Sequence, residues 1–256
     1  MPRTPDYFAD KAIVITGAGS GIGRATALIF GREGANVLCA DIDGAAAQET
    51  ADQVIAAGAK AAATTTDVCD RAAVEAMAAA AIESFGALDF LFNSAGSAIK
   101  RAKFLDIDDD LWKRAYDLNV NGVFYGMQAA LPHMIDAGRG VIVNMASMSH
   151  KRGGAGASIH YASAKGAVLT MTLGVAREFV DRGIRCLAIS PGPVDTAFQA
   201  AASTSPELMQ QFRNDVPMKR FGHPEEIGEL VLFMCSDACE FMTADTVYVN
   251  GGGGWR

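Results

Sequence analysis

The chain has 256 residues, half of them hydrophobic, and a formal net charge of -7, with 22 Lys and Arg against 29 Asp and Glu. This balance excludes the concentrated basic face that nucleic-acid binding requires, so we expect a small-molecule partner and no nucleic acid. The length and the apolar content suffice for one α/β domain with a continuous core.

Residues 1–10 contain prolines and acids instead of a basic segment followed by an apolar stretch, so they do not resemble a secretory signal. No apolar run approaches the roughly 20 residues that cross a bilayer. We therefore expect a cytoplasmic protein with no membrane partner. The five cysteines are odd in number and scattered through apolar runs, which predicts buried thiols, with neither disulfides nor a metal site.

Short apolar runs alternate with alanine-rich segments of helical length, a pattern typical of βα units under a parallel sheet. Strands are predicted at residues 12–16, 36–40, 61–66, 88–93, 140–145, 184–189 and 246–249. Helices are predicted at residues 21–33, 43–57, 70–85, as a pair between 108 and 136, at 158–181, and from near Pro224.

No linker interrupts this alternation, so we predict that residues 1–256 form a single dinucleotide-binding and catalytic domain. Its fold class is α/β, a Rossmann-like, doubly wound, parallel seven-stranded sheet flanked by helices. Residues 1–10 form an N-terminal extension. The long irregular stretch at about 192–220 is expected to be a substrate lid.

A glycine-rich turn follows the first predicted strand and opens the first helix. It contains Gly17, Gly19, Gly21 and Gly23. Glycine lacks a Cβ and lets a pyrophosphate approach the backbone N–H groups at a helix N-terminus. A tight strand-to-helix connection without a ligand is the alternative that this motif alone leaves open.

Asp41 ends the second predicted strand, where an acid can accept hydrogen bonds from the adenosine ribose. Its carboxylate would repel a 2′-phosphate, and neither Ser20 nor Ile42 supplies a cation, so we expect NAD and not NADP. The alternative role for Asp41 is that of N-cap for the next helix, although Asp43 could also be that N-cap.

Tyr161 and Lys165 lie four residues apart in a predicted helix and hence on one face. A nearby ammonium favours phenolate and brings a phenol into the range of a working base. The same spacing is also common on helix surfaces, so the pair alone is weak evidence.

The motifs follow one another in an order that resembles the short-chain dehydrogenase/reductase family in its single-domain form. The resemblance extends over residues 11–252 and rests on the glycine turn, Asn93-Ser94-Ala95-Gly96, Ser147, Tyr161 with Lys165, and Pro191-Gly192. One departure is Ser94, where the family usually has a second asparagine.

The resemblance implies catalytic roles for Tyr161 as general acid/base, for Lys165 in lowering its pKa and holding the nicotinamide ribose, and for Ser147 in orienting substrate. Asn119 resembles the asparagine that holds a relay water. Ser147 precedes Tyr161 by one residue more than is usual in the family, and Ser149 by one fewer. Ser149 therefore stays open as an alternative.

The resemblance also implies a cofactor site along the carboxyl ends of the strands, with Thr196 on the carboxamide. The cofactor-binding residues that it implies are Gly17, Ser20, Gly21, Ile22, Gly23, Asp41, Ile42, Asp67, Val68, Asn93, Ala95, Gly96, Tyr161, Lys165, Pro191, Gly192, Val194 and Thr196.

Substrate contacts are expected from Ser147, Met148, His150, Ile159 and Phe198. Two basic clusters, at residues 100–103 and 150–152, either attract a polyhydroxylated or acidic substrate or point to solvent. The lid is rich in alanine and serine, which favours small polar alcohols, sugars or sugar acids.

We therefore predict an NAD-dependent oxidoreductase that acts on a secondary alcohol or ketone. The alternatives are a reductase of 3-oxoacyl or other keto substrates, a hydroxysteroid-type dehydrogenase, and a non-catalytic nucleotide-binding member of the family. The resemblance further implies a homotetramer, in which Trp255 and Arg256 can reach a neighbouring active site.

Overall fold

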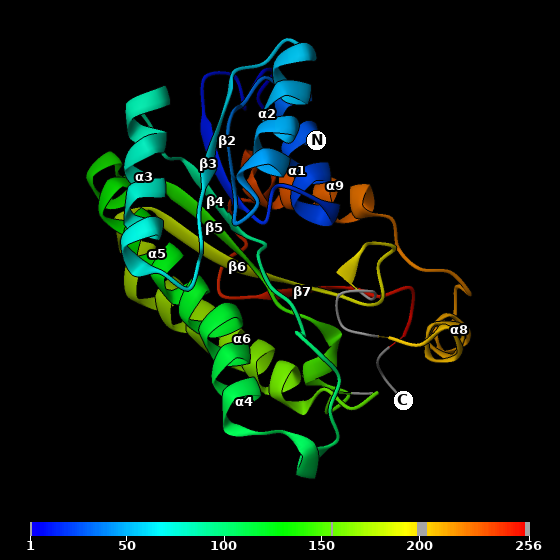
Figure 1. Ribbon diagram of the computed structural model, residues 1–256. Coiled ribbons are helices and arrows are strands. Elements are labelled where there is room, and N and C mark those ends of the chain that lie inside the picture. The colour runs from blue at the N-terminus through cyan, green and yellow to red at the C-terminus, as the bar shows by residue number, and fades with distance from the viewer. Residues whose placement is uncertain (1, 155, 199–203, 254–256) are drawn as a thin grey trace.

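Seven parallel strands form one sheet in the order β3-β2-β1-β4-β5-β6-β7 (Figure 1). The structure is a computed structural model that describes residues 2–154, 156–198 and 204–253. The strands are β1 (Ala12–Thr16), β2 (Asn36–Asp41), β3 (Ala61–Thr65), β4 (Phe90–Asn93), β5 (Gly140–Met145), β6 (Ile184–Pro191) and β7 (Thr246–Val249).

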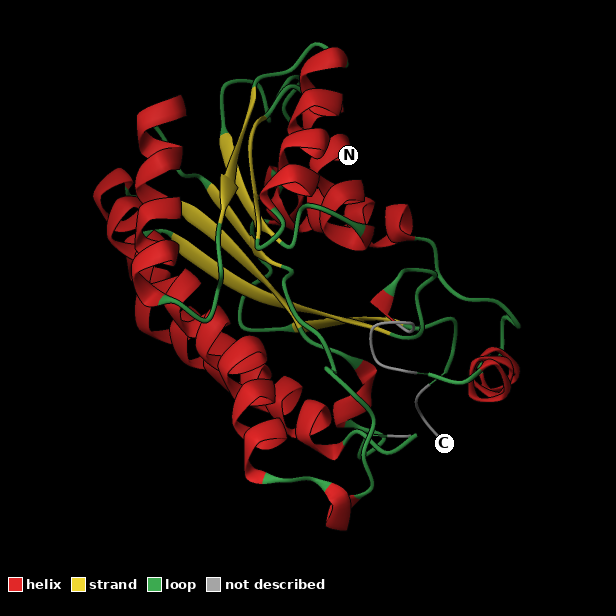
Figure 2. Ribbon diagram, in the orientation of Figure 1, coloured by secondary structure: helices red, strands yellow, loops and turns green. Residues whose placement is uncertain are grey.

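Helices cover both faces of this sheet, as Figure 2 shows. The helix α1 (Gly21–Arg32) packs with α2 (Gly44–Ala56) and α9 (Pro224–Cys235) on one face. On the other face lie α3 (Arg71–Phe85), α5 (Gly122–Ala137) and α6 (Ile159–Phe179), with α4 (Asp109–Tyr116) beside α6.

The central strands are mostly apolar, as expected for strands with both faces buried. Every residue of β1 and β5 is buried, and two apolar clusters fill the layers above and below the sheet. The predicted α/β, Rossmann-like fold with a parallel seven-stranded sheet is confirmed.

The predicted elements differ from the structure in a few places. β4 begins at Phe90 instead of residue 88, and the pair of helices between 108 and 136 is joined by a π-helical turn, η2 (Asp117–Asn121). The predicted irregular lid contains the helix α8 (Pro206–Asp215), which begins with Ser205 accepting a hydrogen bond from the N–H of Leu208. Residues 199–203 of that lid, and Trp255 and Arg256, lie outside the described residues.

The cysteines are free thiols, four of them buried as predicted. Cys69 is exposed, contrary to the prediction, because it lies in the turn between β3 and α3 and not in a strand or helix core. None of the described residues is part of a disulfide.

The N-terminal residues before β1 are tied to the core instead of extending from it. Phe8 is 1% exposed, and its ring lies 5.3 Å from that of Phe30 and 5.7 Å from that of Phe90. Asp237, after α9, accepts hydrogen bonds from the backbone N–H groups of Arg3 and Thr4. The segment thus closes the end of the layer that contains α1 and α9.

Replacing Phe8 by alanine should lower the free energy of unfolding by about 3–5 kcal/mol, because it empties a buried aromatic site. Tyr7, half-buried beside it, is the matched control, and its replacement by alanine should cost clearly less. Urea unfolding followed by circular dichroism measures both. Equal losses for the two variants would contradict the core position of Phe8.

Candidate active site

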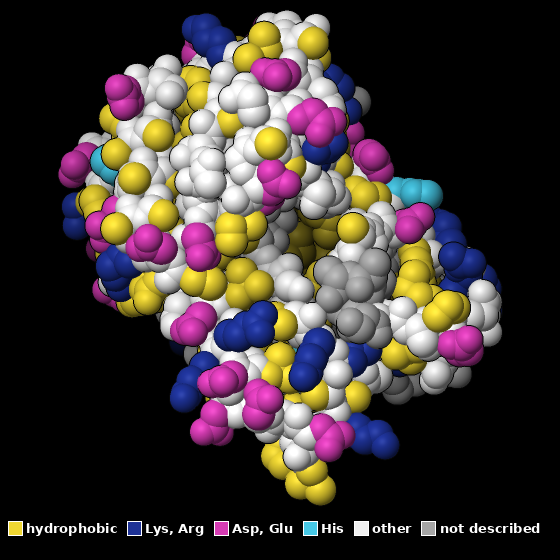
Figure 3. Space-filling model, viewed as in Figure 1, with side chains coloured by type: hydrophobic (Ala, Val, Ile, Leu, Met, Phe, Trp, Pro, Cys, Tyr) yellow, Lys and Arg dark blue, Asp and Glu magenta, His cyan; other side chains and the backbone are white. Residues whose placement is uncertain are grey.

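A cavity of about 530 Å³ opens at the carboxyl ends of the central strands, between the loops that follow them. Figure 3 shows it as a hollow on the face of the molecule. The order of the sheet reverses between β1 and β4, and ligands of open α/β sheets bind at such a crevice. Its volume falls in the range of small-molecule and cofactor sites.

The glycine turn forms one end of this cavity and allows close packing of backbone. Gly17 has φ 69°, and a Cβ on it would lie 3.0 Å from Cα of Ala95. A Cβ on Gly23 would lie 2.1 Å from the carbonyl oxygen of Gly17. Ser20, the N-cap of α1, makes no side-chain capping bond, so the first N–H groups of the helix face the cavity without a side-chain cap. This geometry fits a pyrophosphate.

Asp41, the last residue of β2, lines the cavity beside the glycine turn. Its carboxylate accepts hydrogen bonds from the N–H groups of Gly19, at 2.9 Å, and of Asp43, at 3.0 Å. Asp43 itself caps α2, so capping does not occupy Asp41. The sequence analysis did not identify Arg24, whose guanidinium donates a hydrogen bond to the carbonyl of Gly19. The same guanidinium forms a salt bridge with Glu49, and Arg24 does not line the cavity.

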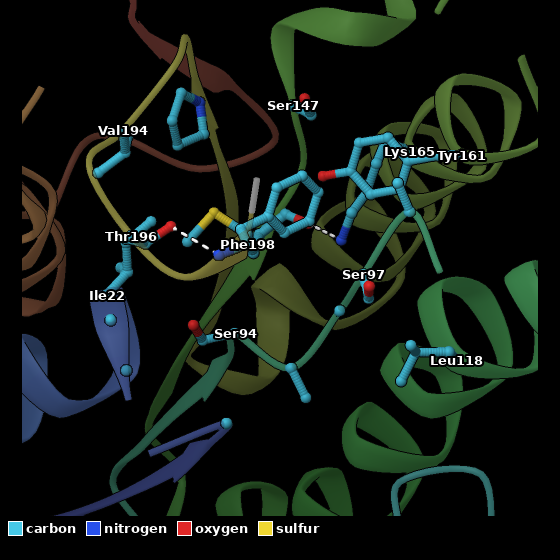
Figure 4. A pocket seen from close by; sticks show the side chains of 18 of the residues that line it. Ile22, Ser94, Ser97, Leu118, Ser147, Tyr161, Lys165, Val194, Thr196 and Phe198 are labelled. Atoms are coloured by element: carbon cyan, nitrogen blue, oxygen red, sulfur yellow. Dashed lines mark hydrogen bonds between the residues drawn. The ribbon is translucent and has the colours of Figure 1, made fainter. Parts of the chain in front are cut away.

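Tyr161 lies at the opposite end, on the first turns of α6. It is 8% exposed, and the ring of Phe198 lies 5.5 Å from its own (Figure 4). Burial raises the pKa of the Tyr161 phenol to about 12, whereas a hydrogen bond with Ser147 and the charge of Arg101 act to lower it. Ser147, and not Ser149, is thus the serine whose hydroxyl meets the phenol.

Lys165 is fully buried one helical turn after Tyr161. Its Nζ donates a hydrogen bond of 2.8 Å to the carbonyl of Met145 and lies 5.7 Å from the centre of the Tyr161 ring. Burial lowers the pKa of Lys165 to about 7. The charge of Arg101 acts to lower the pKa of the phenol. The role of Lys165 in lowering that pKa, which the family resemblance implies, stays a prediction.

Asn119 lies behind the cavity lining, in the π-helical turn η2. Its amide donates to the carbonyls of Ser97, at 2.8 Å, and Ala115, at 2.9 Å, while its buried Oδ1 has no partner. A Cβ on Gly96 would lie 2.7 Å from that oxygen and 3.1 Å from Nζ of Lys165. The two polar groups thus flank the same glycine.

The structure brings most of the predicted residues together around the cavity. Ser147, Met148 and Phe198 of the predicted substrate set line it. The cofactor residues of the sequence prediction that line it are Gly17, Ser20, Gly21, Ile22, Gly23, Asp41, Ile42, Asp67, Val68, Ala95, Gly96, Tyr161, Lys165, Pro191, Gly192, Val194 and Thr196.

Besides Asn119, three predicted residues lie outside the cavity lining. Asn93 is 2% exposed and donates a hydrogen bond of 2.8 Å to Asn144 on the neighbouring strand. The ring of His150 stacks at 6.1 Å on that of Tyr248, and its Nδ1 lies 2.5 Å from the carbonyl oxygen of Ser147. Ile159 precedes Tyr161 by two residues, about 200° around the helix, and therefore faces elsewhere.

Other residues line the cavity although the sequence prediction did not assign them to the site. Ser94 was noted only as a departure from the family, and Arg101 and Arg152 only as members of basic clusters. Phe212 lies on α8, a helix that the sequence analysis did not predict. Further lining residues missed are Thr66, Ser97, Ala98, Leu118, Met145, Ala146, Ser158, Pro193 and Ala197, whereas Ser149 was named only as the alternative to Ser147.

Within the described residues no helix has the length and apolar character needed to cross a membrane. The same residues contain no group of three or more His, Cys, Asp or Glu side chains that could hold a metal ion.

Known proteins with similar sequences and structures are described as dehydrogenases and reductases. A family model described as Enoyl-(Acyl carrier protein) reductase matches residues 17–253. The chain is 37% identical to 2-keto-3-deoxy-L-fuconate dehydrogenase of Xanthomonas campestris pv. campestris, over 98% of this chain and 83% of that protein.

Two solved structures are similar along nearly their whole length. One is a short-chain type dehydrogenase/reductase from Mycobacterium marinum, with TM-score 0.92, 31% identity and 98% of each chain covered. The other is a 7α-hydroxysteroid dehydrogenase complexed with NADH and 7-oxo glycochenodeoxycholic acid, with TM-score 0.90 and 32% identity over 98% of this chain and 97% of that one. Fold and relatives together define an α/β oxidoreductase. The chain belongs to the short-chain dehydrogenase/reductase family.

In the cofactor-free protein, Tyr161 should ionise above the ordinary tyrosine pKa of 10.0, because burial disfavours the phenolate. The ultraviolet difference spectrum between the wild type and Tyr161→Phe, recorded as the pH rises, isolates this group. A phenolate signal from Tyr161 that is complete below pH 10.0 would contradict the burial that we describe. Arg101→Met should move the onset to still higher pH.

Proposed function

We propose that this protein is an NAD-dependent oxidoreductase that transfers a hydride between a secondary alcohol or ketone and nicotinamide, with Tyr161 as general acid/base. The observation that carries the proposal is the Tyr161 phenol, held in the cavity by a hydrogen bond with Ser147 and followed by the buried Lys165. Relatives solved with NADH support the choice of a nicotinamide cofactor.

When bound, the nicotinamide accepts or gives the hydride. In alcohol oxidation the Tyr161 phenolate takes the hydroxyl proton, and in ketone reduction the phenol returns it. Ser147 donates a hydrogen bond to the substrate oxygen and keeps it beside Tyr161. The unpartnered Oδ1 of Asn119 suits a water molecule that passes the proton between Lys165 and solvent.

We propose NAD as the preferred cofactor because of the carboxylate at the adenosine end. Asp41 lines the cavity, and the nearby Arg24 is paired with Glu49, which leaves the negative charge of Asp41 to repel a 2′-phosphate. Binding of the ribose hydroxyls to the same carboxylate favours NAD further.

A sugar, polyol or sugar acid is the substrate class that we propose. The reactive end carries hydroxyl and guanidinium groups, from Ser94, Ser97, Ser147, Arg101 and Arg152. The relative from Xanthomonas is named for a sugar acid, 2-keto-3-deoxy-L-fuconate. A hydroxysteroid or a 3-oxoacyl substrate are the alternatives, each favoured by a similar protein.

We also propose that the chain assembles as a homotetramer. Apolar side chains remain partly exposed on the outer helices, with Phe124 on α5 at 38% and Leu173 on α6 at 41%. Pairing of these helices between subunits would cover them.

Replacing Tyr161 by phenylalanine should lower kcat for alcohol oxidation by about 10²- to 10⁴-fold, the contribution of a general base, with little change in NAD binding. NADH formation on a panel of sugars, sugar acids, polyols and hydroxysteroids at mildly alkaline pH measures it. Ser147→Ala should lose most activity, and the matched Ser149→Ala much less. Full activity of Tyr161→Phe would refute the mechanism.

Replacing Asp41 by asparagine should lower the preference for NAD over NADP at least tenfold, the effect of about 1.4 kcal/mol. The carboxylate accepts from Gly19 through Oδ2 and from Asp43 through Oδ1, whereas asparagine removes the charge and keeps one oxygen, which can accept from one of these two N–H groups. Calorimetric binding of both cofactors provides the measurement. Asp43→Asn, an exposed helix cap outside the cavity, is the control and should leave the ratio unchanged. An unchanged ratio in Asp41→Asn would argue against the assignment.

A further inference from the structure

The charged residues that line the cavity are separated by sign. Among the described lining residues, the acids are Asp41 and Asp67, and both follow strands at the adenosine end. The basic residues are Arg101, Arg152 and Lys165, all from elements around the Tyr161 end, and the two arginines carry its permanent positive charge. The end of the cavity that would hold the substrate is therefore positively charged, although the chain as a whole carries -7.

Arg101 comes from the loop after β4 and is held firmly in the cavity wall. Its Nη1 donates to the carbonyl of Gly156, at 3.1 Å, and its Nε to the hydroxyl of Thr204, at 3.0 Å. The guanidinium lies 5.1 Å from the ring centre of Phe212. Burial lowers the pKa of Arg101, and its charge acts to lower the pKa of Tyr161, which lines the same cavity.

Arg152 comes from the loop after β5 and approaches from another side. Its Nη2 lies 3.3 Å from Oδ2 of Asp215 at the end of α8, and the Asp215 side chain is 40% exposed. A single long contact with an exposed carboxylate contributes little stability. A substrate carboxylate can therefore replace Asp215 as the partner of Arg152 at small cost.

The neighbouring lysines mark the difference between cavity and surface. Lys100 and Lys103 flank Arg101 in the same loop, but both are exposed and neither lines the cavity. Of this basic cluster, only the arginine contributes to the cavity wall. A guanidinium presents a planar pair of donors that matches a carboxylate, which a lysine ammonium cannot do.

We propose that Arg101 and Arg152 form a carboxylate-binding site at the Tyr161 end of the cavity, so that the preferred substrates are hydroxy acids and the corresponding oxo acids. This inference rests on the proposed function, because it identifies what that active site accepts. The arginines come from two different loops and fix the distance between the carboxylate and the reacting hydroxyl. Since both also contact α8, the bound acid lies against the lid.

The test compares acids with neutral partners of nearly the same carbon skeleton. The pairs are gluconate with glucitol, 3-hydroxybutyrate with 1,3-butanediol, and cis-4-hydroxycyclohexanecarboxylate with cis-4-methylcyclohexanol. For each pair, kcat/KM for NADH formation and the shift in Tm in the presence of NADH are measured. The wild type should favour the acid of at least one pair by about 10- to 100-fold in kcat/KM and show the larger Tm shift with it.

Arg101→Met and Arg152→Met should abolish the preference for the acid, measured as the ratio of kcat/KM for acid and neutral partner within each variant, while NADH binds as before. Arg101→Lys should restore only part of it, because the charge remains without the planar fork. Lys100→Met and Lys103→Met remove the same charge nearby and should leave the preference intact. Asp215→Asn should leave it intact or raise it, whereas an Arg152 that merely anchors α8 would make Asp215→Asn behave like Arg152→Met.

The outcomes separate the two proposals. If neutral alcohols turn over as well as their acids, with dependence on Tyr161, the carboxylate site is refuted and the proposed function stands. If the lysine variants lose as much preference as the arginine variants, the effect is general surface charge, and the site is likewise refuted. If NADH binds but no compound turns over and no acid raises Tm above its neutral partner, both proposals fail.

Discussion

Close contact between backbones at the glycine turn is the constraint on which the site depends. The approach of Gly23 to the Gly17 carbonyl, and of Gly17 to Ala95, leaves no room for a Cβ. These contacts bring the start of α1, the end of β1 and the end of β4 together at the point where the order of the sheet reverses. A wider turn would separate these three segments, and the helix N-terminus would no longer face the cavity.

The reactive end is governed by burial. Enclosure in the core raises the pKa of Tyr161 and lowers that of Lys165, so both shifts favour the uncharged form of their group. The polar contacts around them compensate only in part: Ser147 binds the phenol, and the carbonyl of Met145 binds the amine. Arg101 adds a guanidinium charge nearby, which acts to lower the pKa of Tyr161. One arginine can thus influence both the acid/base group and an anionic substrate.

Much of this architecture was predictable from the sequence, because buried strands of a parallel sheet consist of short apolar runs and their helices begin at recognisable caps. The order of strands and motifs, together with the resemblance to the short-chain dehydrogenase/reductase family, led to Asp41, Tyr161 and most of the predicted cofactor residues, which line the cavity. Side-chain direction was harder to predict. Asn93 sits in a motif beside the cavity, yet its amide turns to Asn144 on the adjacent strand. Nothing in the sequence of β4 alone specifies that choice, since the partner lies 51 residues away.

Long-range packing also explains the remaining differences. Arg101 and Arg152 belong to charge clusters that resemble solvated loops, and only the approach of Phe212 and Asp215 from α8 gives them a place in the wall. The helix itself carries a local signal, Ser205 followed by Pro206, but it is short and lies in a segment rich in small residues. The helix propensity of the α8 segment is a weak determinant compared with the tertiary contacts that determine its structure.

The packing of Asp41 against Gly19 limits how cofactor preference can evolve in this chain. A Cβ on Gly19 would lie 2.8 Å from Oδ2 of Asp41 and 2.9 Å from Cβ of Ala46. A larger or cationic residue at position 19 therefore collides with the carboxylate as long as Asp41 remains. The two positions are coupled, and their substitutions will not combine additively. Evolution of a preference for NADP would therefore have to replace Asp41 before Gly19. The intermediate, which lacks Asp41 and has no cation at position 19, would bind both NAD and NADP weakly.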